Sequence, residues 1–159
     1  MAGVIEEAWS YWETIRGDDI VPLRARLDPV DIPGLLSCTI LVDVLFDPLD
    51  FRYRLIGTGM DELSAHRLTG RRFSEIPHIE PDGRLWSDHE TVVRTRMPLM
   101  GTVTYEGPNE FVRAMRHGLF PLSGDGRTVN KIWCVCEVSR AQIVTPSRRV
   151  ADRAEPPGR

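Results

Sequence analysis

Apolar side chains recur at helical spacing in the first part of the chain. Ile5, Ala8, Trp9 and Trp12 fall on one face of a helix, and Gly17 supplies a stop signal. The pattern predicts an amphipathic helix within residues 1–17. Its two tryptophans must cover an apolar surface, on the same chain or in a homodimer, because so short a helix is marginal alone. We predict the homodimer, with Trp9 and Trp12 in the contact.

The next apolar segments have the period of strands. Residues 35–46 are apolar at nearly every position, as in a central strand covered on both faces. A turn of Asp-Pro-Leu-Asp follows at 47–50. Phe51, Tyr53 and Leu55 then alternate with arginines, which indicates a strand with one wet face. The two strands predict a β-hairpin.

A short helix over residues 60–66 and a long helix over residues 82–97 come next. On the long helix, Leu85, Trp86, His89, Val92 and Val93 form one continuous apolar stripe. Three further strands are expected at 99–105, 111–122 and 128–138, joined by turns short enough for antiparallel neighbours. This order predicts an α+β fold: a five-stranded antiparallel sheet with helices inserted between strands two and three, preceded by the amphipathic helix.

Composition divides the chain into four parts. Residues 18–34 hold three prolines and many charges, typical of a linker along the surface, between the helix of residues 1–17 and a domain at 35–140. Residues 141–159 become Arg- and Pro-rich with no apolar period, which predicts a disordered tail.

Charge and hydropathy limit the partners and the location. The net charge of −3 gives no attraction to nucleic acid, and no apolar run approaches the roughly 18 residues of a membrane span. The N-terminus lacks the basic and apolar regions of a signal peptide. The three cysteines are an odd number, and they suggest free thiols in a reducing compartment. We expect a cytoplasmic protein that binds neither nucleic acid nor membrane.

Several motifs resemble one known family. They are Tyr-Trp at 11–12 and Ile-Arg-Gly at 15–17, Pro-Leu-Arg at 22–24, Leu-Asp-Pro at 27–29, Ile-Pro-Gly-Leu-Leu at 32–36, the run from Phe51 to Thr58, Leu-Thr-Gly-Arg at 68–71 and Phe-Pro-Leu-Ser at 120–123. Over residues 9–140 the chain resembles the small PAS-like proteins common in alphaproteobacteria, formerly a domain of unknown function. The resemblance implies strand order 2-1-5-4-3, the long helix across the inner face of the sheet, and a role in signalling. Ser64-Ala65-His66 departs from the family pattern, where a glycine is expected, so no ligand preference is carried over.

A helix that crosses a sheet leaves a hollow suited to a small ligand. We expect the hollow to be bordered by Tyr53, Leu55, Trp86, His89, Val93 and Met115. His89 is the one candidate considered for an axial haem ligand, although haem is not the expected cofactor. A contact to another ligand and a structural histidine are the alternatives.

The other reactive residue types give weaker signals. Cys134 and Cys136 share one face of a strand, and Cys38 is expected nearby, but zinc needs four ligands in short clips and none exists here. We expect reduced thiols without metal, with reversible oxidation as an alternative. Residues 60–72 hold no cysteine for flavin photochemistry, and Ser87-Asp88-His89 cannot converge as a triad from consecutive helix positions. Arginines near positions 52–72 form either a solvated face or a surface for an acidic partner.

The sequence therefore predicts a cytoplasmic PAS-type sensory or adaptor module that is not an enzyme and has no output domain of its own. It would bind a small ligand, a partner protein or both. One alternative is a structural interaction module whose hollow is filled by side chains. The other is a haem- or metal-dependent redox sensor.

Overall fold

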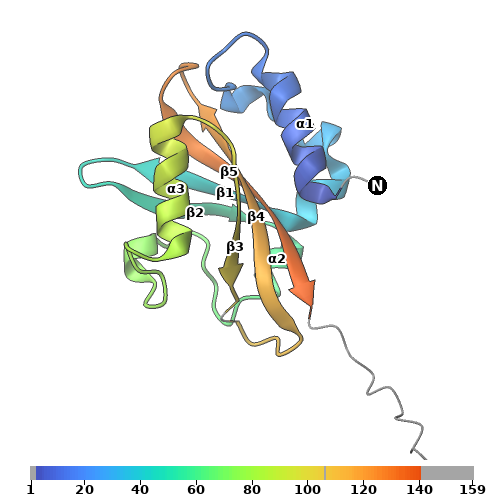
Figure 1. Ribbon diagram of the computed structural model, residues 1–159, viewed down its shortest axis with the longest axis vertical. Helices are drawn as coiled ribbons and strands as arrows, with labels where there is room; N and C mark the ends of the chain where they lie inside the picture. The colour runs from blue at the N-terminus through green and yellow to red at the C-terminus, as the bar shows by residue number, and fades with distance from the viewer. Residues whose placement is uncertain (1–2, 106, 141–159) are drawn as a thin grey trace, which may run out of the picture.

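One antiparallel sheet organises the molecule. The computed structural model describes residues 3–105 and 107–140, and the sheet within them has five strands in the order β2-β1-β5-β4-β3, as Figure 1 shows. The strands are β1 (Thr39–Leu45), β2 (Asp50–Ile56), β3 (Leu99–Thr104), β4 (Val112–Ser123) and β5 (Val129–Arg140). The predicted tail at 141–159 lies outside the described residues.

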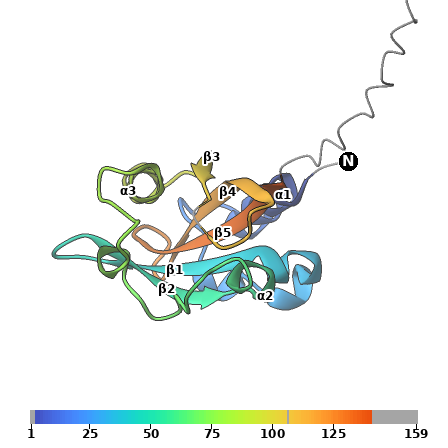
Figure 2. The ribbon, with the colours of Figure 1, turned by 90° about the horizontal axis from the view of Figure 1, so that it is seen from below.

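The helices stand where the α+β prediction places them. They are α1 (Val4–Arg16), α2 (Thr58–Asp61) and α3 (Arg84–Thr95), with short 3-10 helices η1 (Arg24–Arg26), η2 (Pro29–Asp31), η3 (Pro33–Cys38) and η4 (Phe73–Glu75). Because α2, η4 and α3 lie between the second and third strands, the predicted fold is confirmed. Figure 2 shows α3 nearly end-on, with α2 beside the β2 edge of the sheet.

Some boundaries differ from the prediction. The first strand begins at Thr39 rather than at 35, because residues 33–38 form η3. Pro33 favours a first helical turn, and the Thr39 hydroxyl donates a hydrogen bond of 2.8 Å to the carbonyl oxygen of Leu35. The short helix covers 58–61 instead of 60–66. The long helix ends at Thr95 because Arg96 takes a left-handed φ of 58°.

The two faces of the sheet carry separate cores. Ile132, Cys134 and Cys136 of β5 point to the face that α3 covers, while Trp133 and Val135 point to the opposite face. This alternation is the period of two that a strand imposes. Figure 1 shows α1 and α3 to either side of the central strands β4 and β5. The face under α3 is called the inner face below, and the face under α1 the outer face.

Helix α1 covers the sheet of its own chain. Trp12 is 2% exposed, and its indole N–H donates a hydrogen bond of 2.8 Å to the carbonyl oxygen of Pro121. Trp9 is half-buried, with its ring edge-on to Phe120 at 5.9 Å between centroids. The prediction that Trp12 lies in a dimer contact is therefore wrong. The physical reason is the apolar outer face of β4 and β5, which would otherwise meet water.

The segment between α1 and the sheet is also packed rather than a free linker. Val21, Leu27 and Ile32 are buried. Leu27 and Ile32 belong to the same outer-face cluster as α1, whereas Val21 belongs to the inner-face cluster. Pro29 and Pro33 begin the short helices η2 and η3, and they do not keep the segment away from the core.

Candidate functional site

A cavity of 470 Å³ lies on the inner face of the sheet. Its walls come from the sheet, from α2 and the residues after it, and from the segment that leads into α3. Its apolar lining includes Ile40, Ile56, Met60, Leu63, Leu68 and Met115. An apolar hollow of this volume is within the usual range for small-molecule sites.

A bulge in β2 decides which residues of that strand reach the cavity. Leu41 pairs with Leu55, but Val42 pairs with Tyr53, so Arg54 is an extra residue in the strand. The bulge reverses the alternation after Tyr53. As a result, Leu55 is 47% exposed, and Ile56 lines the cavity in its place. The prediction that Leu55 borders the cavity is wrong for this reason.

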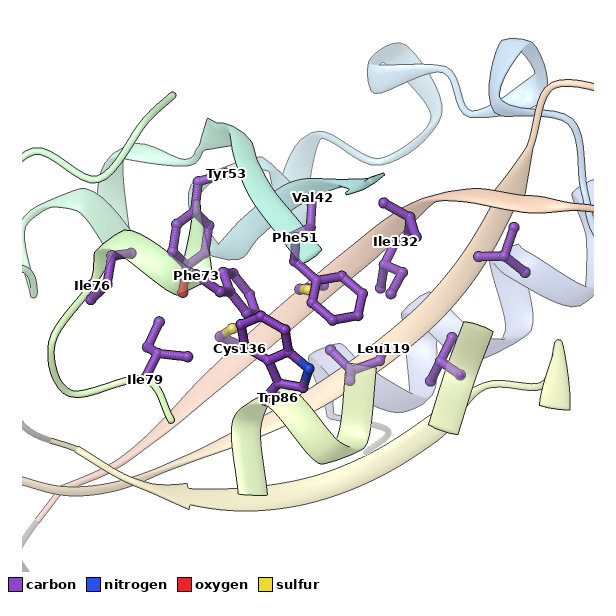
Figure 3. Close-up of a cluster of buried hydrophobic side chains, with 14 of the residues drawn as sticks. Val42, Phe51, Tyr53, Phe73, Ile76, Ile79, Trp86, Leu119, Ile132 and Cys136 are labelled. Carbon is purple, nitrogen blue, oxygen red and sulfur yellow. The ribbon is translucent and has the colours of Figure 1, made fainter. Parts of the chain in front are cut away.

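The other predicted residues divide between the cavity and the adjoining core. Tyr53, His89 and Met115 line the cavity. Trp86 is buried beside it, with its ring edge-on to Phe51 at 5.5 Å between centroids, as Figure 3 shows. Val93 is half-buried and packs against the inner-face core without lining the cavity. Ligand contact by the wall residues remains a prediction.

The His89 imidazole forms hydrogen bonds within the protein through both ring nitrogens. Nδ1 lies 2.7 Å from the carbonyl oxygen of Leu85, and Nε2 lies 3.6 Å from the sulfur of Cys134. Burial lowers the pKa of His89 to about 3, so the ring is neutral at neutral pH. Nδ1–H therefore donates to Leu85, and Nε2 accepts from the Cys134 thiol. A haem iron at Nε2 would have to displace this thiol.

A second histidine on the wall escaped the sequence reasoning. His117 of β4 is 2% exposed, and its Nε2 lies 2.9 Å from Oδ2 of Asp88 on α3. Arg84 holds the same carboxylate, with its Nε 2.9 Å from Oδ1. A Cβ on Gly101 would lie 2.5 Å from Asp88 Oδ2, so the glycine leaves room for this Arg84–Asp88–His117 network.

The sequence does contain a signal for this network. Asp88 lies three residues after Leu85 and four before Val92, so it falls on the buried stripe of α3. A carboxylate on a buried face needs a polar partner. His117, isolated on a largely buried strand, is the matching residue, but only the β4 register brings the two together.

The cysteines are all free thiols. Cys134 and Cys136 are buried on the cavity wall, whereas Cys38 is half-buried, with its sulfur 3.2 Å from the carbonyl oxygen of Leu35. Burial raises the pKa of Cys136 to about 12 and also raises the pKa values of Cys38 and Cys134. In residues 3–105 and 107–140, no three His, Cys, Asp or Glu side chains are placed to hold a metal ion.

Comparison with known proteins identifies the family. The family profile for the PAS domain matches residues 4–135, so the chain belongs to the PAS domain family. Two chains of solved structures match. One, from a fungal LOV domain photoreceptor, shares 12% identity over 73% of this chain and 94% of its own length, with a TM-score of 0.48. No curated protein matches the chain.

A helix crosses a membrane only if it is long and apolar enough. Among the described residues, no helix is long and apolar enough to cross a membrane.

Proposed function

We propose that this PAS domain is a sensory or adaptor module that binds a small ligand in its inner-face cavity and performs no catalysis of its own. The cavity itself is the observation that carries the proposal: 470 Å³ of space with an apolar wall and a few polar atoms. Because side chains leave this space open, the proposal is better supported than a structural module with a filled hollow.

The polar groups of the wall favour binding over reaction. His117 and Cys136 are cross-strand neighbours, yet no hydrogen bond joins them in the part of the chain that the structure describes. The raised thiol pKa values keep the cysteines protonated at neutral pH, where a thiol is a poor nucleophile and a poor redox sensor. A cytoplasmic location is part of the proposal, supported by the three free thiols.

A protein partner is also part of the proposal, because the cavity wall is joined to an arginine-rich surface. The backbone N–H of Tyr53 donates to Arg71 at 3.0 Å, and the N–H of Gly70 donates to Tyr53 at 2.7 Å. Arg54, Arg67 and Arg72 nearby are exposed. A ligand that moves Tyr53 would thereby shift the backbone of this surface. The positive charge of the surface suits an acidic partner.

A cavity-filling variant tests ligand binding. Met115→Trp places a large ring in the cavity, whereas Met100→Trp makes the same change on β3 at a side chain that is 40% exposed. A thermal-shift screen of small metabolites should give compounds that raise the melting temperature of the wild type and of Met100→Trp, but not of Met115→Trp. Equal shifts in both variants would place binding outside the cavity and contradict the proposal.

The native ligand is sought in the same protein. Mass spectrometry of molecules that co-purify with the wild type should detect a compound that Met115→Trp loses. An absorption spectrum of the same sample separates the redox alternative, since a bound haem or flavin would colour it.

A further inference from the structure

Two polar atoms on the cavity wall have no hydrogen-bond partner among the residues that the structure describes. Neither Nδ1 of His117 nor the hydroxyl of Tyr53 forms a hydrogen bond to any residue that the structure describes. Within that same part of the chain, neither atom is among the fully buried side-chain N or O atoms that lack a hydrogen bond. Nδ1 of His117 and the Tyr53 hydroxyl are therefore open to the cavity that both residues line.

These two side chains are themselves deeply buried. His117 is 2% exposed and Tyr53 is 9% exposed. Figure 3 shows the Tyr53 hydroxyl directed toward Ile76 and Ile79, on the side where Ile79 lines the cavity. A buried polar group without a partner is costly, so each of these atoms favours a ligand that hydrogen-bonds to it.

The network around Asp88 fixes the hydrogen-bonding role of His117. Arg84 Nε donates to both carboxylate oxygens of Asp88, at 2.9 and 3.1 Å, so both oxygens act as acceptors. Because Oδ2 is an acceptor, His117 must donate to it through Nε2–H. In the neutral ring Nδ1 then carries a lone pair, and the cavity presents an acceptor at this point.

We propose that the cavity selects neutral, largely apolar ring compounds with one hydrogen-bond donor, whose hydrogen Nδ1 of His117 accepts. This inference rests on the proposed function, because it names the ligand class of the same cavity. Carboxylates are disfavoured at this point of the wall, since their oxygens would face the Nδ1 lone pair. A cation finds no uncompensated carboxylate beside His117, because Arg84 pairs with Asp88.

Three matched probes test this selection: naphthol, methoxynaphthalene and naphthoate, substituted at the same ring carbon. Calorimetric titration of the full chain at neutral pH should show naphthol binding at least about tenfold more tightly than its ether, because the ether leaves Nδ1 unpaired. Naphthoate should bind more weakly than naphthol. Equal binding of naphthol and its ether, or tightest binding of naphthoate, overturns the inference and leaves the proposed function standing. Failure of all three probes to bind overturns the inference alone, because the metabolite screen tests the proposed function separately.

Asp88→Asn changes which ring nitrogen of His117 carries the hydrogen, without changing the shape of the cavity. With Arg84 held by the amide oxygen, the amide N–H₂ faces His117 Nε2, which must then accept, and Nδ1 becomes the donor. The advantage of naphthol over its ether should fall to less than about threefold in this variant. Asp82→Asn, an exposed change just before α3, is the control and should keep the wild-type ratio. A wild-type ratio in Asp88→Asn overturns the inference.

The tautomer can be measured without any ligand, and without the variant should it fail to fold. Long-range proton–nitrogen NMR correlations of the His117 ring should show hydrogen on Nε2 in the wild type. Hydrogen on Nδ1 in the ligand-free wild type overturns the inference directly.

Discussion

Gly101 is the residue on which the Asp88–His117 contact depends most directly. A Cβ at this position would lie 2.5 Å from Asp88 Oδ2 and 3.0 Å from His117 Nε2. We expect Gly101→Ala to push the pair apart and lower the free energy of unfolding by about 1–3 kcal/mol, since the carboxylate then loses a buried partner. Urea denaturation monitored by tryptophan fluorescence measures the change.

Gly34→Ala is the matched control for this change. Gly34 has no heavy atom within 4 Å of its would-be Cβ, so this variant should stay within about 1 kcal/mol of the wild type. If Gly101→Ala were as stable as Gly34→Ala, steric room for the pair would not explain the glycine.

Single residues also show how far the sequence could predict the site. The stripe on α3 placed His89 toward the sheet, and His89 does line the cavity. Its partner Cys134 could not be predicted, because the contact depends on how α3 lies over β5. Asp88 could have been recognised as a carboxylate on a buried face. Nothing local identifies His117 as its partner, since the two are 29 residues apart.

At the scale of elements, periodicity predicted which segments form helices and strands better than it predicted which strand residues face the cavity. The periods of 2 and 3.6 residues separate the strands from α1 and α3, and the PAS resemblance implied the strand order. The bulge at Arg54 was not predictable, because the strand around it alternates regularly. That single extra residue exchanged Leu55 for Ile56 on the cavity wall. Nor did the sequence show that residues 33–38 would be helical.

Helix α1 gives the prediction at this scale. Trp12→Ala removes a ring buried against the outer face together with its hydrogen bond to Pro121. We expect a loss of about 3–5 kcal/mol in the free energy of unfolding. Trp9→Ala, at a half-buried ring four positions from its hydrogen-bond partner Glu13, should cost only about 1 kcal/mol. Equal losses in urea denaturation would contradict the packing of α1 described here.

The whole molecule is still predicted to form a homodimer, although not through Trp12. Light scattering of the wild type and Trp9→Ala at high concentration tests this, because Trp9 retains exposed surface on α1. A dimeric wild type with a monomeric Trp9→Ala variant would place the contact on α1. A monomeric wild type would end the dimer prediction.

The stability of the whole molecule also depends on two histidines that are buried without charge. Burial lowers the pKa of His89 to about 3 and lowers the pKa of His117 despite the Asp88 carboxylate beside it. In the unfolded chain both rings titrate near pH 6.5. Below that pH the unfolded state therefore binds protons that the folded state does not, and stability must fall as the solution becomes more acidic.

Between about pH 7 and about pH 5, we expect the free energy of unfolding of the wild type to decrease, by up to about 1.4 kcal/mol per pH unit for each histidine. Burial raises the pKa of Asp43, but Lys131 and Arg52 lower it by more. Asp43 therefore contributes to the pH dependence only in stronger acid. His89→Gln should reduce the slope of stability against pH, because one of the two titrating rings is gone. His66→Gln, at an exposed position, should leave the slope unchanged. Urea midpoints across this range measure it, and identical slopes in the wild type and His89→Gln would show that His89 is not held neutral.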